Sequence, residues 1–356
     1  MMPEKRAQIF GLIVSLALWG LTSFASGVSF EEALKSLDGL SARERLARLE
    51  KEARREGRIR WSSSTNLDRI EPLLNAWKKK YPGIQIEYHR VTGRKLADLA
   101  IAEHRAGRHE IDILGTTAVT FLSLKEAGVL RPYVSPETGA FRSGMRDPQG
   151  YWVSEYSNVL AIICNKNRVK SPPRNWQDLT DRRWKGDFSI DSERFQWLAA
   201  LQKIYGEEAA KQLMLAYRQN GALVRRGGTL QAQLVAAGEY SCTPGAYLNS
   251  AYLLKERGAP LNYSVPEPVM LSPSITMMTR FPPDPYAAML FYDYSISPEG
   301  MSHFTRNNAL FPSRENVPVV EDIRALEGKR LYFIDVEEQS RRYKELSETY
   351  QALVEK

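Results

Sequence analysis

The sequence has few of the side chains that metal centres and nucleophilic enzymes use. Its 356 residues include only two cysteines and four histidines. The histidines, His89, His104, His109 and His303, fall on predicted surface helices or turns with no nucleophile motif beside them. The patterns HExxH, GxSxG, GxxxxGK[ST] and GxGxxG are all absent. We therefore expect a protein that is not an enzyme and that carries no cofactor.

Long apolar runs are missing after the N-terminal region, so no transmembrane helix is predicted in the body of the chain. Lys5 and Arg6 precede an apolar run, Ile9–Leu21, which the small residues of Ser23–Gly27 follow. This run of about 13 residues is too short to cross a ~30 Å hydrocarbon core. The pattern is typical of a cleavable secretory signal, assigned to residues 1–27, with an uncleaved anchor as the alternative. We expect a mature periplasmic protein.

The two cysteines, Cys164 and Cys242, cannot make a zinc site on their own. In an exported protein they are candidates for a disulfide, because the compartment is oxidising. A disulfide also requires the two α-carbons to lie close together, and the sequence does not determine that distance. A disulfide and two free thiols therefore both stay open.

An excess of basic residues gives a formal net charge of +7 and a pI near 9.2. The lysines and arginines are scattered and alternate with acids, as in Ser41–Glu56, which is typical of a solvated helix with i,i+4 ion pairs. No nucleic-acid recognition motif accompanies the charge. We expect a charged N-terminal helix over 28–56 and no nucleic-acid partner.

Strand-like and helix-like segments alternate in the first third of the chain. Apolar strands are predicted at 58–62, 84–88 and 111–114, with helices between them, which indicates an α/β lobe with a largely parallel sheet. Polar side chains follow two of these strands, at Ser62–Asn66 and Gly115–Thr117. Ligands bind at the carboxyl ends of such strands, so we expect a binding site there. For any one of these residues, capping of the next helix is the alternative.

Four segments further along resemble one family of proteins. They are Tyr81–Tyr88, with its YPGI turn, Trp176–Asp187, with the pattern W-x-D-L-x-D-x-x-W-K-G, Leu290–Met301 and Ala309–Arg314. Together they resemble the periplasmic solute-binding proteins of bacterial ABC importers, in the two-lobe class that includes ferric-iron and thiamine binders. The resemblance extends over about residues 55–335.

The resemblance implies a type 2 periplasmic binding fold. It is an α/β architecture of two lobes, each a mostly parallel sheet flanked by helices, with crossing strands as the hinge. The implied divisions are lobe 1 at 57–155 and 266–315, lobe 2 at 156–265, crossings at 152–165 and 261–268, and a C-terminal strand and helix packed outside at 316–356. It further implies a monomer that captures a solute by lobe closure and delivers it to an ABC permease. A periplasmic ligand sensor on the same fold is the alternative.

Two departures from the family disfavour ferric iron as the solute. The adjacent tyrosines of the ferric binders correspond here to Asn249 and Ser250, and the family's anion-binding arginine corresponds to Tyr156. An irregular oxygen site for iron, made by Glu155, Tyr156, Tyr247 and Tyr252, is kept as the alternative.

The preferred interpretation is a small polar or anionic organic solute. Arg194, with Arg225, Arg226 and the helix start at Gly227–Thr229, favours a carboxylate, phosphonate or phosphate group. Trp197 is expected in the core rather than against the solute. The predicted ligand-binding residues are Ser63, Ser64, Thr65, Asn66, Thr116, Thr117, Glu155, Tyr156, Arg194, Thr229, Tyr247 and Asn249.

Overall fold

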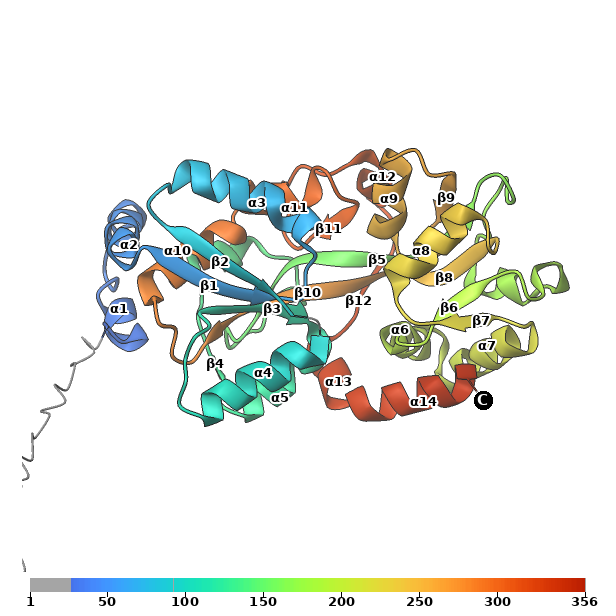
Figure 1. Cartoon of the computed structure of the whole chain (residues 1–356), viewed down its shortest axis with the longest axis horizontal. Helices are drawn as coiled ribbons and strands as arrows, with labels where there is room; N and C mark the ends of the chain where they lie inside the picture. Colours follow the sequence, from blue (N-terminus) through green and yellow to red (C-terminus); the bar gives the residue numbers. More distant parts are fainter. Residues whose placement is uncertain (1–26, 92, 356) are drawn as a thin grey trace, which may run out of the picture.

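Two α/β lobes lie side by side and are joined by long strands that pass between them (Figure 1). The computed structural model describes residues 27–91 and 93–355. Lobe 1 begins with three parallel strands, in the order β2-β1-β3. Their bounds are β1 (Arg58–Ser63), β2 (Gln85–Arg90) and β3 (Ile113–Thr117). Parallel neighbours need crossover connections, which the sequence supplies as two amphipathic helices, α3 (Leu67–Lys80) and α4 (Gly93–Arg105).

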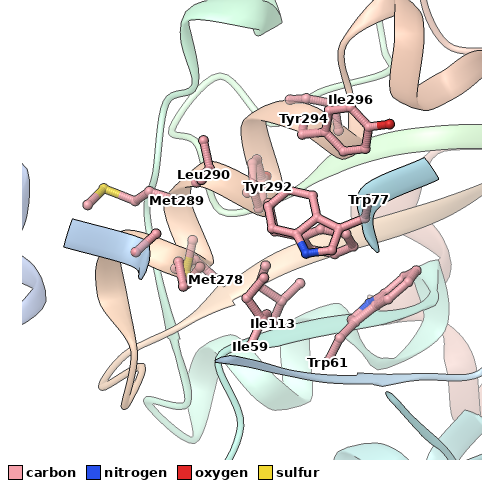
Figure 2. Close-up of a cluster of buried hydrophobic side chains, with 14 of the residues drawn as sticks. Ile59, Trp61, Trp77, Ile113, Met278, Met289, Leu290, Tyr292, Tyr294 and Ile296 are labelled. Carbon is pink, nitrogen blue, oxygen red and sulfur yellow. The ribbon is translucent and has the colours of Figure 1, made fainter. Parts of the chain in front are cut away.

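Helices cover both faces of the lobe 1 sheet. On one face lie Trp61 of β1 and Trp77 of α3 (Figure 2). Their rings meet that of Phe291 in α10, at centroid distances of 5.1 and 5.2 Å. On the other face α4 and α5 bury Leu96 and Phe121. The remaining elements of this lobe are η1 (Ala118–Thr120), α5 (Phe121–Glu126), β4 (Leu130–Arg131), η2 (Pro136–Ala140), α10 (Pro285–Ser295), α11 (Pro298–Thr305) and β11 (Leu310–Pro312).

Strand β5 (Val153–Asn165) belongs to both lobes. All 13 of its residues are buried. Its first half pairs with β10 (Val269–Thr279) and β11 in lobe 1. Its second half pairs with β8 (Cys242–Tyr247) and β9 (Leu261–Ser264) in lobe 2. The chain returns to lobe 1 on β10. Within the predicted second crossing at 261–268, β9 still pairs inside lobe 2, and residues 265–268 lead from β9 to β10.

Lobe 2 is smaller and has its own core, centred on Trp176, Trp197 and Tyr217. The parallel pair β6-β7 joins β8 through a bridge between Phe188 and Cys242. Its further elements are η3 (Trp176–Thr180), η4 (Arg182–Trp184), β6 (Ser189–Asp191), α6 (Phe195–Tyr205), α7 (Glu207–Gln219), β7 (Leu223–Arg225), α8 (Gly228–Ala237) and α9 (Leu248–Glu256). The predicted two-lobe α/β fold is confirmed, although antiparallel pairs make its sheets mixed rather than mostly parallel.

Two segments differ from the sequence expectation. The single N-terminal helix is two helices, α1 (Phe30–Lys35) and α2 (Ala42–Glu56), because Ser29 and Ser41 each begin a helix with a capping box. The C-terminal segment is not only an outer layer. Strand β12 (Leu331–Phe333) pairs with β10, and the later helices bury side chains in both lobes. These elements are α12 (Glu321–Arg324), α13 (Val336–Arg341) and α14 (Tyr343–Glu355).

The predicted signal segment, residues 1–27, lies almost wholly outside the described residues, which begin at Gly27. Within the described ranges, no helix has the length and apolar character that crossing a membrane requires.

Cys164 and Cys242 form a disulfide inside lobe 2. They face each other across β5 and β8, and both are fully buried. The bond therefore ties the lobe 2 end of the crossing strand to its neighbour, across 78 residues of sequence.

Replacing both cysteines by alanine (Cys164→Ala with Cys242→Ala) should lower the free energy of unfolding by about 2–5 kcal/mol, because the unfolded chain regains the entropy of a long loop. Urea unfolding followed by circular dichroism measures the change. An unchanged midpoint and slope would contradict a stabilising role for this bond.

Candidate functional site

The lobe 1 half of the candidate site lies where β1 and β3 end, at the edge of the sheet that faces lobe 2 (Figure 1). The Ser63 hydroxyl accepts a hydrogen bond from the Thr65 backbone N–H at 3.1 Å, and the Ser64 N–H donates to the Gly115 carbonyl at 2.8 Å. A β-carbon on Gly115 would lie 2.8 Å from the Ser63 hydroxyl oxygen, so only glycine lets β1 and β3 approach this closely.

Neighbouring strands bring further predicted residues to this edge. Ser274 of β10 pairs with Thr117 on one side and with Tyr156 on the other. The Tyr156 hydroxyl then reaches the Thr65 hydroxyl at 3.0 Å. The structure therefore brings together Ser63 and Thr65 at the end of β1, Thr117 at the end of β3 and Tyr156 within β5.

Two polar side chains of this half are not used by the fold itself. Thr116 is buried, yet its hydroxyl has no hydrogen-bond partner among the described residues. Asn66 occupies the N-cap position of α3, but its side chain makes no capping hydrogen bond. Simple helix capping therefore does not account for Asn66.

Arg194 dominates the lobe 2 half and is held rigidly. It is 8% exposed, and its Nη2 donates to Asp191 Oδ2 at 2.8 Å. The guanidinium carbon lies 4.1 Å from the centre of the Tyr247 ring. A β-carbon on Gly228 would lie 2.3 Å from Nη2, so the start of α8 also packs on the arginine. Its Nε–H is buried and has no partner within the described part of the chain.

Asp191 connects this arginine to the loop before α8. Its second carboxylate oxygen accepts hydrogen bonds from the backbone N–H groups of Glu193 and Gly227, at 3.2 and 3.1 Å. The sequence interpretation missed Asp191, which ends β6 as Ser63 and Thr117 end β1 and β3.

Of the three arginines predicted to favour an anion, only Arg194 is buried in the structure. Arg226 is exposed and pairs with Glu193 at 2.8 Å, and Arg225 is also exposed. Thr229 is exposed at the start of α8. Trp197 lies in the lobe 2 core, 5.1 Å from Trp176 between ring centroids, as expected.

Asn249 lies two residues after Tyr247 in α9. It is 0% exposed, and neither its amide nitrogen nor its amide oxygen has a hydrogen-bond partner among the described residues. A buried amide without partners costs folding free energy, so such a group needs an explanation.

The two halves are held at a short distance by β5. Leu160 of β5 pairs with Tyr247, and Tyr156 lies four residues earlier on the same strand. At a rise of about 3.3 Å per residue, roughly 13 Å of strand separate the two tyrosine positions. The strand therefore keeps the two halves of the candidate site close to each other.

Residues 111–340 match the family of bacterial extracellular solute-binding proteins. That stretch is more than half of the chain. The chain belongs to this family.

Solved structures agree with the family match. This solute-binding protein superposes with a TM-score of 0.73 on AfuA from Actinobacillus pleuropneumoniae, solved with exogenous fructose-6-phosphate, at 22% identity, covering 84% of this chain and 99% of that one. The IdiA (FutA) protein of Trichodesmium, in complex with iron and citrate, superposes with a TM-score of 0.70 at 21% identity, covering 83% of this chain and 99% of that one. The ferric binding protein from Campylobacter jejuni superposes with a TM-score of 0.71 at 21% identity, again covering 83% of this chain and 99% of that one. Identities this low show a shared fold.

A curated relative, an uncharacterized protein of Haemophilus influenzae, is 28% identical over 190 residues, which are 49% of this chain and 55% of that protein. The chain thus matches about half the length of that relative. The family match confirms the prediction of a solute-binding protein, and the structural neighbours confirm its two-lobe fold.

Three tyrosines of the alternative iron site each contact other side chains in the structure. Tyr156 bonds to Thr65, and Tyr247 lies under Arg194. Tyr252 packs against a different cluster, which includes Leu248. In the described part of the chain, no group of three or more histidine, cysteine or carboxylate side chains is placed to hold a metal ion.

Glu155 differs from the other predicted ligand residues, because its carboxyl lies among lobe 1 side chains. Burial raises the pKa of Glu155 to about 8, and a hydrogen bond with the Ser295 side chain lowers it only in part. Its Oε1 has no partner among the described residues. Between the pKa of an unfolded glutamate and pH 8, the folded protein therefore keeps a proton that the unfolded chain has lost.

This proton makes the stability of the protein dependent on pH. The contribution of Glu155 to the free energy of unfolding is fully present below about pH 4.3, near the pKa of an unfolded glutamate. It is lost as pH rises toward 8, by about 1.4 kcal/mol for each pH unit between these two pKa values. Urea unfolding at several values between pH 5 and pH 8 should show this decline, and Glu155→Gln should make it shallower, because the amide does not titrate. Parallel curves for the two proteins would contradict the assignment.

Proposed function

We propose that this protein captures a small polar or anionic organic solute between its lobes and delivers it to an ABC permease. The observation that carries the proposal is a set of buried polar atoms without partners on both sides of β5. They are the Thr116 hydroxyl in lobe 1, and Arg194 Nε and the Asn249 amide in lobe 2. Burial without a partner costs about 1–3 kcal/mol for each group, and a solute that bonds to them offsets this cost.

The donors and acceptors favour a particular chemistry. Arg194 is permanently charged and already oriented by Asp191, Tyr247 and Gly228, so it loses little side-chain entropy on binding. Its unpartnered Nε–H suits one oxygen of a carboxylate, phosphate or phosphonate. Asn249 offers both a donor and an acceptor, and Thr116 a hydroxyl, which suits a polar body on the same solute.

Capture works by lobe closure. A solute that touches Thr116 on lobe 1 and Arg194 on lobe 2 binds the closed arrangement more tightly than an open one, so it shifts the population toward closure. A permease that recognises the closed arrangement then receives only loaded protein. The protein acts as a periplasmic monomer, exported by its N-terminal signal, and performs no chemistry on the solute.

Iron remains the alternative solute, but the burial of Tyr156 argues against it. Burial raises the pKa of Tyr156, which disfavours the phenolate that a ferric ion requires.

A sensor function is tested separately, by asking whether solute-loaded protein stimulates the ATPase activity of the permease.

The proposal is tested first by native mass spectrometry of protein released gently from the periplasm, which should carry a small organic anion. Thermal unfolding with fructose 6-phosphate, inorganic phosphate, citrate, thiamine, spermidine and ferric citrate then ranks the candidates. A probe at a hundred times its dissociation constant stabilises the protein by about 2.7 kcal/mol. A visible tyrosinate–iron colour with ferric citrate alone would favour iron instead.

Arg194→Gln should abolish the thermal shift caused by the best anionic probe, because the charged contact is lost. Arg226→Ala is the matched control, since that side chain is 78% exposed and lies on the same rim of lobe 2. Urea unfolding of both variants without probe separates lost binding from lost folding. An equal shift in Arg194→Gln and the unaltered protein would contradict the proposal.

A further inference from the structure

The C-terminal helices form a third connection between the lobes, besides β5 and β10. After β12, α13 packs against η1 and α5 in lobe 1, and α14 then packs against α6 and α7 in lobe 2 (Figure 1). The family match ends at residue 340, so α14 lies beyond it. We refer to α13 and α14, residues 336–355, as the strap.

The strap is anchored in the cores of both lobes. Val336 of α13 is buried in the lobe 1 cluster that contains Phe121. The Ser340 hydroxyl accepts a hydrogen bond from the Leu122 N–H at 2.8 Å and donates to the Val119 carbonyl at 3.2 Å. In lobe 2, α14 buries Leu346, Tyr350, Leu353 and Val354. Neither end can leave its lobe without exposing apolar surface.

Both anchor points lie next to the two halves of the candidate site. In lobe 1 the strap holds η1, which begins directly after Thr117. In lobe 2 the Tyr350 hydroxyl donates to the Asp191 carbonyl at 2.9 Å, and the carboxylate of Asp191 holds Arg194. The strap therefore links the strand end that carries Thr116 to the residue that orients the arginine.

A single joint separates the two halves of the strap. Arg342 ends α13 with φ −92° and ψ 9°, and α14 begins at the next residue. Tyr343 at this joint touches both lobes. The Arg94 guanidinium of lobe 1 lies 5.3 Å from its ring centroid, and the Phe195 ring of lobe 2 lies 5.2 Å from it, edge to face.

We propose that the strap limits how far the lobes separate. Tyr343 is the positioning residue, because its contacts with both lobes hold lobe 1 and lobe 2 at a fixed distance at the joint. Opening must change the backbone angles at Arg342 or break the contacts of Tyr343 with Arg94 and Phe195. Terminal residues of elements absorb such changes in hinge motions. The inference goes beyond solute capture, because it concerns the resting separation of the lobes.

The test measures the distance between the lobes in the full chain without any solute. Spin labels on Ala102→Cys in α4 and Lys211→Cys in α7, both exposed positions, report the distance by double electron–electron resonance. The native cysteines do not interfere, since both are in the buried disulfide. Tyr343→Ala should lengthen the mean distance by more than about 2 Å and broaden its distribution.

Two further variants keep the test decisive. Arg94→Ala removes the lobe 1 contact of Tyr343, together with an exposed ion pair to Asp98 at 3.9 Å within α4. It should shift the distance in the same direction by a smaller amount, even if Tyr343→Ala does not fold. Lys344→Ala is the control, because this neighbouring side chain is 87% exposed and pairs with Glu348 inside α14 itself. Distributions that Arg94→Ala and Tyr343→Ala leave unchanged would overturn the proposal. An equal shift in Lys344→Ala would also overturn it.

Discussion

Strand β5 pairs along its whole length with partners in both lobes, and this pairing positions the two lobes relative to each other. Its first half lies between β10 and β11, and its second half between β8 and β9. Because every residue of this strand is buried, it cannot slip or detach without losing hydrogen bonds and apolar contacts on both sides. The disulfide fixes its lobe 2 end, and Tyr156 and the neighbour of Tyr247 lie on it at a fixed spacing.

The candidate site follows from this constraint. Strands β1 and β3 run in the same direction as β5, so their carboxyl ends point toward lobe 2 and present Ser63, Thr65 and Thr116 there. Lobe 2 contributes Arg194 and Asn249, which are buried with polar atoms that have no hydrogen-bond partner among the described residues. In the proposed function, selectivity for a solute arises from groups that are already oriented, and the movement of the lobes decides whether they act together.

The sequence allowed the fold, the family and the polar strand ends to be predicted, because these depend on local periodicity and short motifs. What it could not provide depends on contacts between distant residues. Asp191 receives its hydrogen bond from Tyr350, 159 residues later, so the contribution of the C-terminal helix was not visible. Burial of Glu155 and exposure of Arg225 and Thr229 depend likewise on how helices pack, whereas their residue types alone suggested ligand contacts.

In the proposed function, one solute is held by both lobes on either side of β5. A crystal structure of the protein isolated with its natural solute would test this. Electron density is expected to contact Thr116 on lobe 1 and both Arg194 and Asn249 on lobe 2. Density confined to one lobe, or a metal ion coordinated by tyrosine side chains with Arg194 still unpartnered, would contradict it.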